Sequence, residues 1–296
     1  TGTSGVREMA GWQFWIDRGG TFTDIVARRP DGTLVTHKLL SENPQRYADA
    51  ALQGIRDILG IAPDAPIPAE RIEAVKMGTT VATNALLERK GEPTLLVINQ
   101  GFGDALRIGQ QHRPRLFDLN IVLPEQIYAR MLEVPGRLDA HGAEIEPLDL
   151  DAARRGLEAA YADGLRACAI VFMHGYRYPR HEQAVAELAA AIGFTQISVS
   201  HRVSPMIKLV ARGDTATVDA YLSPILRRYV DRVAAELGGT RLMFMQSNGG
   251  LTDAQLFQGK DSILSGPAGG VVGLAKVAAL AGEQRVIGFD MGGTST

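Results

Sequence analysis

The chain has 296 residues, 45% hydrophobic and 22% charged, which is the composition of an ordinary globular protein long enough for two domains. Its formal net charge of −2, with Lys and Arg scattered along the chain, argues against a nucleic-acid partner. No apolar stretch approaches the about 20 residues that span a bilayer, and the one cysteine, Cys168, cannot form an internal disulfide, so we expect a cytoplasmic protein without a membrane partner.

The amino-terminal part predicts a hairpin, a third strand and a helix. The stretch before Met9 is small and polar, and we expect a tag or a disordered start over residues 1–11. Gly19-Gly20 separates two runs of aromatic and β-branched residues, as in a hairpin. The elements expected are strands at 12–17, 21–28 and 33–40 and a helix over 44–59. Together they form a first unit, residues 12–70.

The middle of the chain, residues 71–212, predicts an α/β region. Helical and strand patterns alternate along it, which is typical of a parallel sheet. The elements expected are strands at 72–77, 94–99, 167–173 and 196–200 and helices at 81–89, 151–163 and 181–192. We take this region as the candidate substrate side.

Residues 213–296 predict linking helices and the start of a further lobe. An apolar stripe over 214–237 indicates a long helix, in which Ser223-Pro224 favours a break and a restart. We also expect a strand at 241–245, a helix at 267–280 and a last strand at 285–290.

One pattern occurs twice, at residues 16–23 and again at residues 289–296. In each copy an apolar strand ends in Asp, and a Gly-Gly pair and hydroxyl residues follow. Glycine permits positive φ and a close approach of backbone N–H groups to phosphate oxygens. One copy alone would fit an ordinary hairpin equally well, whereas two copies favour two lobes that hold one nucleotide.

The expected nucleotide ligands come from both copies of this pattern. They are Asp17, Arg18, Gly19, Gly20, Thr21, Thr23, Asp290, Gly292, Gly293, Thr294 and Ser295. A carboxylate beside a polyphosphate requires a divalent cation between them. Asp17 and Asp290 are therefore the expected catalytic pair and the expected Mg²⁺ ligands, through water.

The duplicated loop resembles those of the actin, sugar-kinase and heat-shock ATPase superfamily, in which two ribonuclease H-like lobes bind ATP. The resemblance implies an α/β fold: a ribonuclease H-like, actin-like ATPase lobe with an inserted α/β region and a truncated second lobe. Six motifs are similar to those of the hydantoinase A/5-oxoprolinase family and occur in family order. They lie at 17–24, 77–91, 113–119, 246–250, 265–270 and 290–296.

This family resemblance implies an ATP-dependent amidohydrolase that phosphorylates the lactam oxygen of 5-oxo-L-proline, so that water opens the ring to L-glutamate. The segments 113–119 and 128–148 look more like 5-oxoprolinase than like hydantoinase. The family pattern continues past Thr296, which implies an incomplete amino-terminal fragment that is inactive alone. It also implies a hydrolase B half or subunit as a partner, in a homo- or hetero-oligomer.

Other functions remain open at this stage. One is an ATP-dependent hydantoinase or ketone carboxylase subunit, which would activate another carbonyl in the same way. Another is a nucleotide-sensing regulatory module whose output is closure of the lobes, and a third is an actin-like scaffold.

The substrate residues are less well defined. The candidates are Thr79, Thr80 and Asn84, at the start of a helix, and Arg113, in a loop with proline. Capping of the helix explains some of the first three equally well, and a solvated loop explains Arg113. We expect the small residues of 265–273 to pack against a neighbouring element rather than to bind phosphate, with Gly269, Gly270 and Gly273 allowing close approach.

Overall fold

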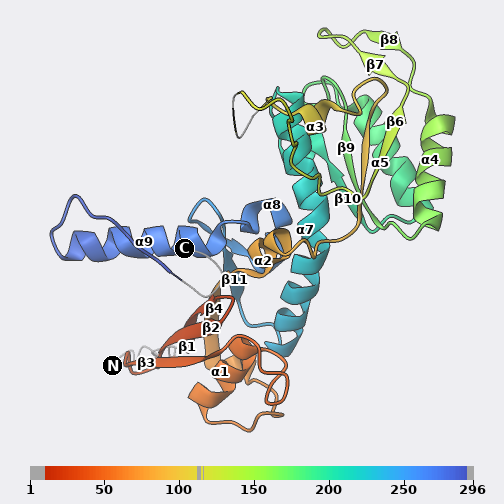
Figure 1. The fold of residues 1–296 in the computed structure, drawn as a ribbon. Helices are drawn as coiled ribbons and strands as arrows, with labels where there is room; N and C mark the ends of the chain where they lie inside the picture. Colours follow the sequence, from red (N-terminus) through yellow and green to blue (C-terminus); the bar gives the residue numbers. More distant parts are fainter. Residues whose placement is uncertain (1–10, 112–114, 116, 292–296) are drawn as a thin grey trace, which may run out of the picture. The chain divides into compact units, whose positions relative to one another are not determined.

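The structure, a computed structural model, describes residues 11–111, 115 and 117–291. The chain divides into two compact units: unit 1 comprises Thr1–Glu88 and Leu226–Thr296, and unit 2 comprises Arg89–Ile225. Unit 2 is thus inserted between the two parts of unit 1 in the sequence (Figure 1). Within the described residues, no helix combines the length and the apolar character that a membrane span needs.

Unit 1 is built on a six-stranded mixed sheet in the order β12-β11-β4-β1-β2-β3. Its strands are β1 (Trp12–Arg18), β2 (Phe22–Arg28), β3 (Leu34–Leu40), β4 (Ile72–Thr79), β11 (Leu242–Met245) and β12 (Leu251–Asp253). The first three strands form an antiparallel meander, as the sequence predicts, and β4 and β11 run parallel to β1. β4, which the sequence analysis grouped with the middle region, therefore belongs to this sheet.

The helices of unit 1 are α1 (Ala50–Leu59), η1 (Ala69–Arg71), α2 (Val81–Leu87), η2 (Ala254–Leu256), α8 (Gly259–Ser262) and α9 (Ser265–Leu280). Apart from α1 and α9, these helices are short. One face of the sheet, with Phe14 and Ile16 of β1, packs on α1 and on the carboxyl-terminal part of α7 (Leu209–Glu236). Every second residue of β1 therefore enters the core.

Unit 2 holds a parallel sheet in the order β10-β9-β5-β6, which confirms the α/β prediction for this part of the chain. Its strands are β5 (Thr94–Asn99), β6 (Arg130–Val134), β9 (Ala167–Val171) and β10 (Gln196–Val199), and β7 (Arg137–Leu138) pairs with β8 (Glu144–Glu146). Its helices are α3 (Ala105–Ile108), α4 (Leu150–Ala162), α5 (Arg180–Ile192), α6 (Ser200–Val203) and the first part of α7. All residues of β5 and β9 are buried, as in a sheet covered on both faces.

Two elements differ from the prediction. Helix α7 continues through Pro224 without a break. A proline inside a helix costs about 3 kcal/mol. Burial outweighs this cost, because Ala220 before the proline and Leu226 after it are both in hydrophobic cores.

The predicted last strand at 285–290 is wrong. This segment forms no strand, and Ile287 and Phe289 are 96% and 79% exposed. Its apolar sequence suits a strand, but a strand is stable only where a neighbouring strand or a covering layer is present.

Candidate functional site

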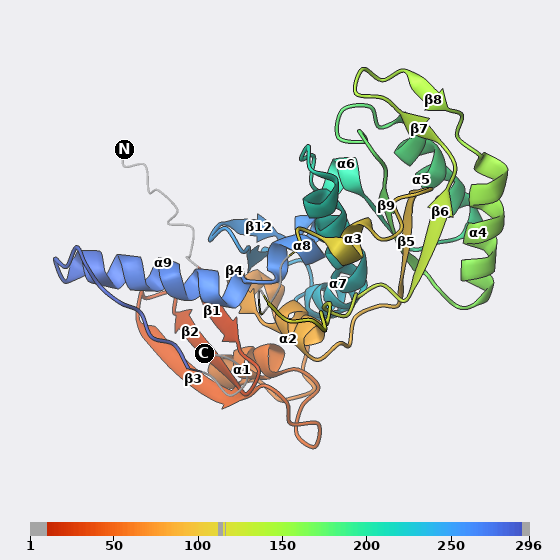
Figure 2. The same ribbon diagram turned by 45° about the horizontal axis from the view of Figure 1, so that its top comes forward.

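The candidate site lies at one edge of the sheet of unit 1, where three parallel strands end side by side. β1, β4 and β11 are neighbours, so the segments that follow Arg18, Thr79 and Met245 emerge at the same edge. Ligands of α/β proteins bind at such carboxyl ends. Figure 2 shows α9 beginning beside this edge of the sheet, next to β4 and α2.

Asp17 projects from the open face of the sheet, opposite to its core neighbour Ile16. It is directly paired with Asp24 on β2 and with Gly78 on β4. A Cβ atom at Gly78 would stand 3.5 Å from Asp17 Oδ1, so the absence of a side chain there leaves one flank of the carboxylate open. Asp24 is paired with Lys38, whose Nζ lies 2.8 Å from Asp24 Oδ1.

The two repeated acids interact electrostatically. The pKa of Asp17 is raised above its ordinary value, first by loss of solvation and then by the negative charges of Asp24 and Asp290, while Lys38 opposes the shift. Asp290, from the second copy of the pattern, therefore acts on Asp17 within unit 1. Like-charged carboxylates favour a cation between them.

The described residues do not form a dedicated metal cage. No group of three or more His, Cys, Asp and Glu side chains among them is placed to hold a metal ion. Mg²⁺ in phosphate-transfer sites is commonly bound by one or two carboxylates, water and the substrate phosphates. Asp17 and Asp290 are chemically suited to that mode of binding.

Two hydrogen bonds to the backbone of Gly19 hold the turn after Asp17. Gly19 N–H donates to the Phe22 carbonyl at 3.0 Å, and the Gly19 carbonyl accepts from Ser41 Oγ at 2.7 Å. Gly19 does not have the positive φ that the sequence led us to expect; instead, an added Cβ would lie 2.9 Å from Phe22 O. Glycine is required here by close approach of the backbone rather than by a left-handed conformation.

Two of the expected ligands face away from Asp17. Thr23 is fully buried, and its Oγ1 lies 3.0 Å from Ser41 Oγ. Arg18 is paired with Thr23 across the hairpin, and its guanidinium lies 5.2 Å from the centre of the Tyr229 ring. The sequence could have predicted that these two residues face away from Asp17, because neighbouring side chains in a strand point to opposite faces. Gly20 and Thr21, in contrast, are exposed in the turn that follows β1.

The polar residues at the start of α2 form structural contacts. Thr79 is fully buried, and its Oγ1 accepts from Val81 N–H at 3.2 Å. The N–H and Oγ1 of Thr80 both donate to the Arg18 carbonyl, at 3.1 and 3.2 Å, and Asn84 Nδ2 donates to Thr80 Oγ1 at 3.4 Å. Thr80 therefore links α2 to the end of β1.

The first turn of helix α9 packs against the end of β4 and the start of α2. Buried Ser265 donates through Oγ to the Thr79 carbonyl at 2.7 Å, and a Cβ at Gly266 would stand 3.4 Å from Thr80 Cγ2. The expected close approach at the later glycines is found only in part. A Cβ at Gly269 would lie 3.9 Å from two Met245 side-chain atoms, an ordinary contact, and no described atom lies within 4 Å of a Cβ built at Gly270 or Gly273.

Two serines that shape this edge were not predicted from the sequence. Ser41 holds the turn of the hairpin, as described above. Ser247 donates through Oγ to the Asp261 carbonyl at 2.8 Å and accepts from Leu264 N–H at 3.0 Å, which ties the loop after β11 to the start of α9. Neither serine lies near its partner in the sequence, so no local pattern indicates these contacts.

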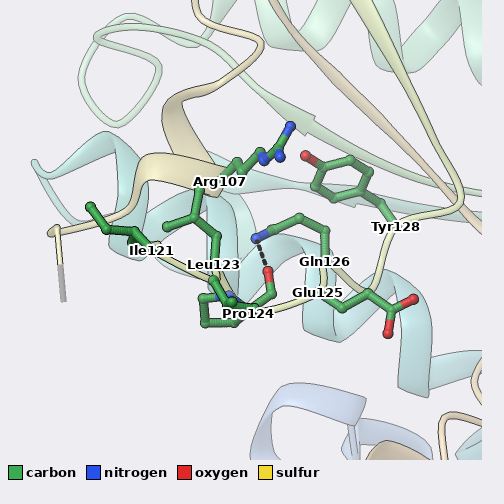
Figure 3. Close-up of a pocket in the computed structure, with 8 residues that line it drawn as sticks. Arg107, Ile121, Leu123, Pro124, Glu125, Gln126 and Tyr128 are labelled. Carbon is green, nitrogen blue, oxygen red and sulfur yellow. Dashed lines mark hydrogen bonds between the residues drawn. The ribbon is translucent and has the colours of Figure 1, made fainter. Parts of the chain in front are cut away.

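Some of the predicted ligands lie outside the described residues. These are Gly292, Gly293, Thr294, Ser295 and Arg113. Among the described residues of unit 2, a cavity of about 650 Å³ is lined by Arg107, Tyr128 and residues 121–126 (Figure 3). Burial raises the pKa of Tyr128, as does the charge of Asp104, whereas Arg107 opposes the shift.

Comparison with known proteins gives the family. Residues 13–193 match the hydantoinase/oxoprolinase N-terminal region, and residues 212–296 match hydantoinase/oxoprolinase. The chain is 43% identical to 5-oxoprolinase 1 of Arabidopsis thaliana over 96% of its own length, and spans 25% of that protein. The chain therefore covers about a quarter of this curated relative.

Two solved structures share the fold. The ATP-dependent caprolactamase of Pseudomonas jessenii superimposes with a TM-score of 0.80 and 32% identity, over 95% of this chain and 42% of that one. Acetone carboxylase in its nucleotide-free form gives a TM-score of 0.75 at 21% identity, over 91% of this chain and 41% of that one. These matches confirm the predicted α/β, actin-like ATPase fold with its inserted region. The chain belongs to the hydantoinase/oxoprolinase family.

Proposed function

We propose that this chain provides the nucleotide-binding region of an ATP-dependent cyclic amide hydrolase whose substrate is 5-oxo-L-proline and whose product is L-glutamate. The observation that carries the proposal is the pair Asp17 and Asp290, which interact electrostatically beside the Gly19-Gly20 turn. The 43% identity to a 5-oxoprolinase favours this substrate, and the caprolactamase match supports the use of ATP on a lactam.

The proposed chemistry explains why ATP is needed. An unstrained lactam is a poor electrophile, and transfer of a phosphoryl group to its oxygen converts that oxygen into a leaving group. The oxygen–γ-phosphorus bond forms as the bond to ADP breaks, and water then adds to the ring carbon. The ring carbon–nitrogen bond breaks as the nitrogen takes up a proton, which leaves an acyl phosphate, and a second water hydrolyses this to L-glutamate and inorganic phosphate. The protein supplies mainly position and charge neutralisation in such transfers.

In this proposal the residues of the chain hold the triphosphate and its cation. Asp17 and Asp290 would bind Mg²⁺ through water, and Mg²⁺ would neutralise the phosphate charge. Gly20 and Thr21 are exposed in the turn that follows β1, where the Gly20 N–H and the Thr21 hydroxyl would donate to phosphate oxygens. Thr80 and Asn84 support the turn from α2, and we propose no direct substrate contact for them.

We also propose a partner half or subunit that completes the hydrolase. One relative, 35% identical, is named caprolactamase subunit alpha, and this chain spans 42% of it. A subunit so named has at least one partner in its own enzyme. We further propose a cytoplasmic location, because the lone Cys168 is a free, buried thiol.

The test is substrate-dependent release of ADP by the full-length native protein. 5-Oxo-L-proline, hydantoin, caprolactam and acetone are supplied in turn with MgATP, and ring opening is followed by chromatography. We expect stimulation by 5-oxo-L-proline above the other three, and its loss in Asp17→Asn but not in Asp31→Asn, an exposed turn residue of the same sheet. Binding of MgATP without stimulation by any of them would favour a regulatory module instead.

A further inference from the structure

We propose that Arg18 is a positioning residue that holds the phosphate-binding turn from the covered face of the sheet, through a cluster with buried Asp49 and Tyr229 and half-exposed Arg232. We call this set the Arg18 cluster. The inference deepens the proposed function, because it assigns to Arg18 an indirect role in nucleotide binding instead of contact with phosphate.

The geometry of the cluster centres on the Tyr229 ring. The Arg18 Cζ atom lies 5.2 Å from the ring centre and the Arg232 Cζ atom lies 5.7 Å from it. Tyr229 and Arg232 are three residues apart on α7 and so project from the same side of the helix. One buried aromatic ring therefore contacts both the end of β1 and its own helix.

Asp49 supplies the negative charge of the cluster. It caps α1: its Oδ1 accepts from the N–H groups of Ala51 and Leu52, at 2.9 and 3.2 Å. Its Oδ2 lies 3.5 Å from Arg232 Nη2, and its side chain is 1% exposed. The cap of α1 and the end of β1 are thus joined through residues of α7.

Three polar atoms of the cluster have no hydrogen-bond partner among the described residues: Arg18 Nε, Asp49 Oδ2 and Tyr229 Oη. Buried polar atoms without partners are costly and rare in folded proteins. The Arg232 side chain is 52% exposed, so solvent screens its charge, whereas the Arg18 guanidinium lies behind the turn on the covered face of the sheet. The positive charge of Arg18 favours an anion at Gly19-Gly20 without touching it.

The backbone connects this cluster to the site. The Arg18 carbonyl accepts from both the N–H and the Oγ1 of Thr80, and Gly19 is the next residue of the turn. Loss of the contact between Arg18 and the ring would free the Arg18 side chain and let the turn shift. Because binding depends on the position of the turn, the affinity for MgATP should fall more than the rate of the chemical step.

The experiment measures the dissociation constant for MgATP, kcat and the KM for ATP in the full-length native protein. The variants are Arg18→Met, Tyr229→Leu and the double variant, with Tyr229→Phe as the conservative replacement that keeps the ring. The matched control is Arg29→Met, which removes a guanidinium that lies 5.9 Å from the Trp12 ring, on the same sheet but away from the turn. Thermal unfolding of every variant checks that it is folded.

We expect both single variants to weaken MgATP binding about tenfold, in line with a desolvated cation–π contact, and the double variant to be no weaker than either. KM should rise with the dissociation constant while kcat changes less, and Tyr229→Phe should recover most of the affinity. A folded Tyr229→Leu that binds MgATP like the wild type, while Arg18→Met does not, would overturn the proposal and make Arg18 a direct ligand. Failure of the wild type to bind MgATP would instead refute the proposed function.

Discussion

Asp17 and Asp290 interact electrostatically although they lie near opposite ends of the chain: burial raises the pKa of the Asp17 carboxyl, and the negative charges of Asp24 and Asp290 raise it further. β1 leads to the first acid, and the segment after α9 leads to the second, so both copies of the repeated pattern contribute to unit 1. Two carboxylates that repel each other are stabilised by a cation within reach of both. This relationship accounts for the proposed site.

A first prediction concerns pH and stability. The folded-state pKa of Asp17 lies above its ordinary value of 3.8, so the folded protein holds this proton more tightly than the unfolded chain does. Ionisation of Asp17 therefore destabilises the fold as the pH rises through the raised pKa, and this penalty is absent below pH 3.8. We expect Asp17→Asn to have a higher Tm than the wild type at neutral pH, with the difference vanishing in acid.

The control for this titration is Asp31→Asn, for which the sign is opposite. Hydrogen bonds from Thr33 lower the pKa of Asp31, so its ionised form stabilises the turn above its ordinary pKa of 3.8. Asp31→Asn should therefore lower the Tm at neutral pH, and the difference should disappear as the pH falls. Calorimetry of both variants across this range is the measurement. A Tm of Asp17→Asn at or below that of the wild type at neutral pH would contradict the account.

A second prediction concerns the hairpin turn. A Cβ at Gly19 would stand 2.9 Å from a backbone oxygen, which cannot move independently of the turn. Gly19→Ala should cost about 1–3 kcal/mol of stability and abolish MgATP binding. Gly270→Ala, in open space within α9, should instead stabilise its helix by about 0.5–1 kcal/mol. Chemical denaturation of the two variants compares them directly; equal effects would argue against a tightly closed turn.

A third prediction concerns a buried network in unit 2. Glu182 is fully buried and accepts from Phe172 N–H at 2.8 Å, from Ser200 Oγ at 2.5 Å and from His201 Nδ1 at 2.6 Å, and its charge acts on buried Arg212. Glu182→Gln leaves that arginine without its carboxylate, and we expect a loss of about 3–5 kcal/mol.

The comparison for this network is Glu158→Gln. That carboxylate forms only an exposed pair with Arg154 at 3.9 Å, and its loss should cost under about 0.5 kcal/mol. Urea denaturation measures both variants. A small loss for Glu182→Gln would mean that the network tolerates an uncompensated arginine.

A fourth prediction concerns Cys168. Burial in the all-parallel sheet of unit 2 raises the pKa of its thiol to about 12, so the reactive thiolate is scarce and inaccessible in the folded protein. A thiol reagent such as dithionitrobenzoate should react at the rate at which unit 2 opens, and promptly once denaturant is added. Rapid reaction under native conditions would contradict the buried position.

The sequence predicted the local elements well and the long-range contacts poorly. Continuous apolar runs identify β5 and β9 because both faces of their sheet are covered, and the Gly19-Gly20 pair identifies the hairpin. The alternation of side chains along a strand also predicts that Arg18 and Thr23 face the covered side of the sheet. A match to a phosphate-loop motif does not show which side each residue faces. Local composition does not predict whether Pro224 breaks a helix or whether 285–290 finds a strand partner, because both depend on packing.

In the site, too, local patterns were predicted from the sequence and long-range contacts were not. The sequence identifies Asp17 and Asp290 as a repeated pair, since the pattern itself is local. The contact of Arg18 with Tyr229 joins residues of β1 and α7 that are far apart in the chain, and no spacing rule indicates it.

The central claim is that Asp17 and Asp290 bind magnesium triphosphate together, and the most direct test is calorimetric titration of the full-length native protein with a non-hydrolysable ATP analogue, with and without Mg²⁺. We predict binding by the wild type that depends on Mg²⁺ and is lost to a similar extent in Asp17→Asn and in Asp290→Asn, with Asp31→Asn unchanged. Mg²⁺-dependent binding that persists in both acid variants would contradict the claim.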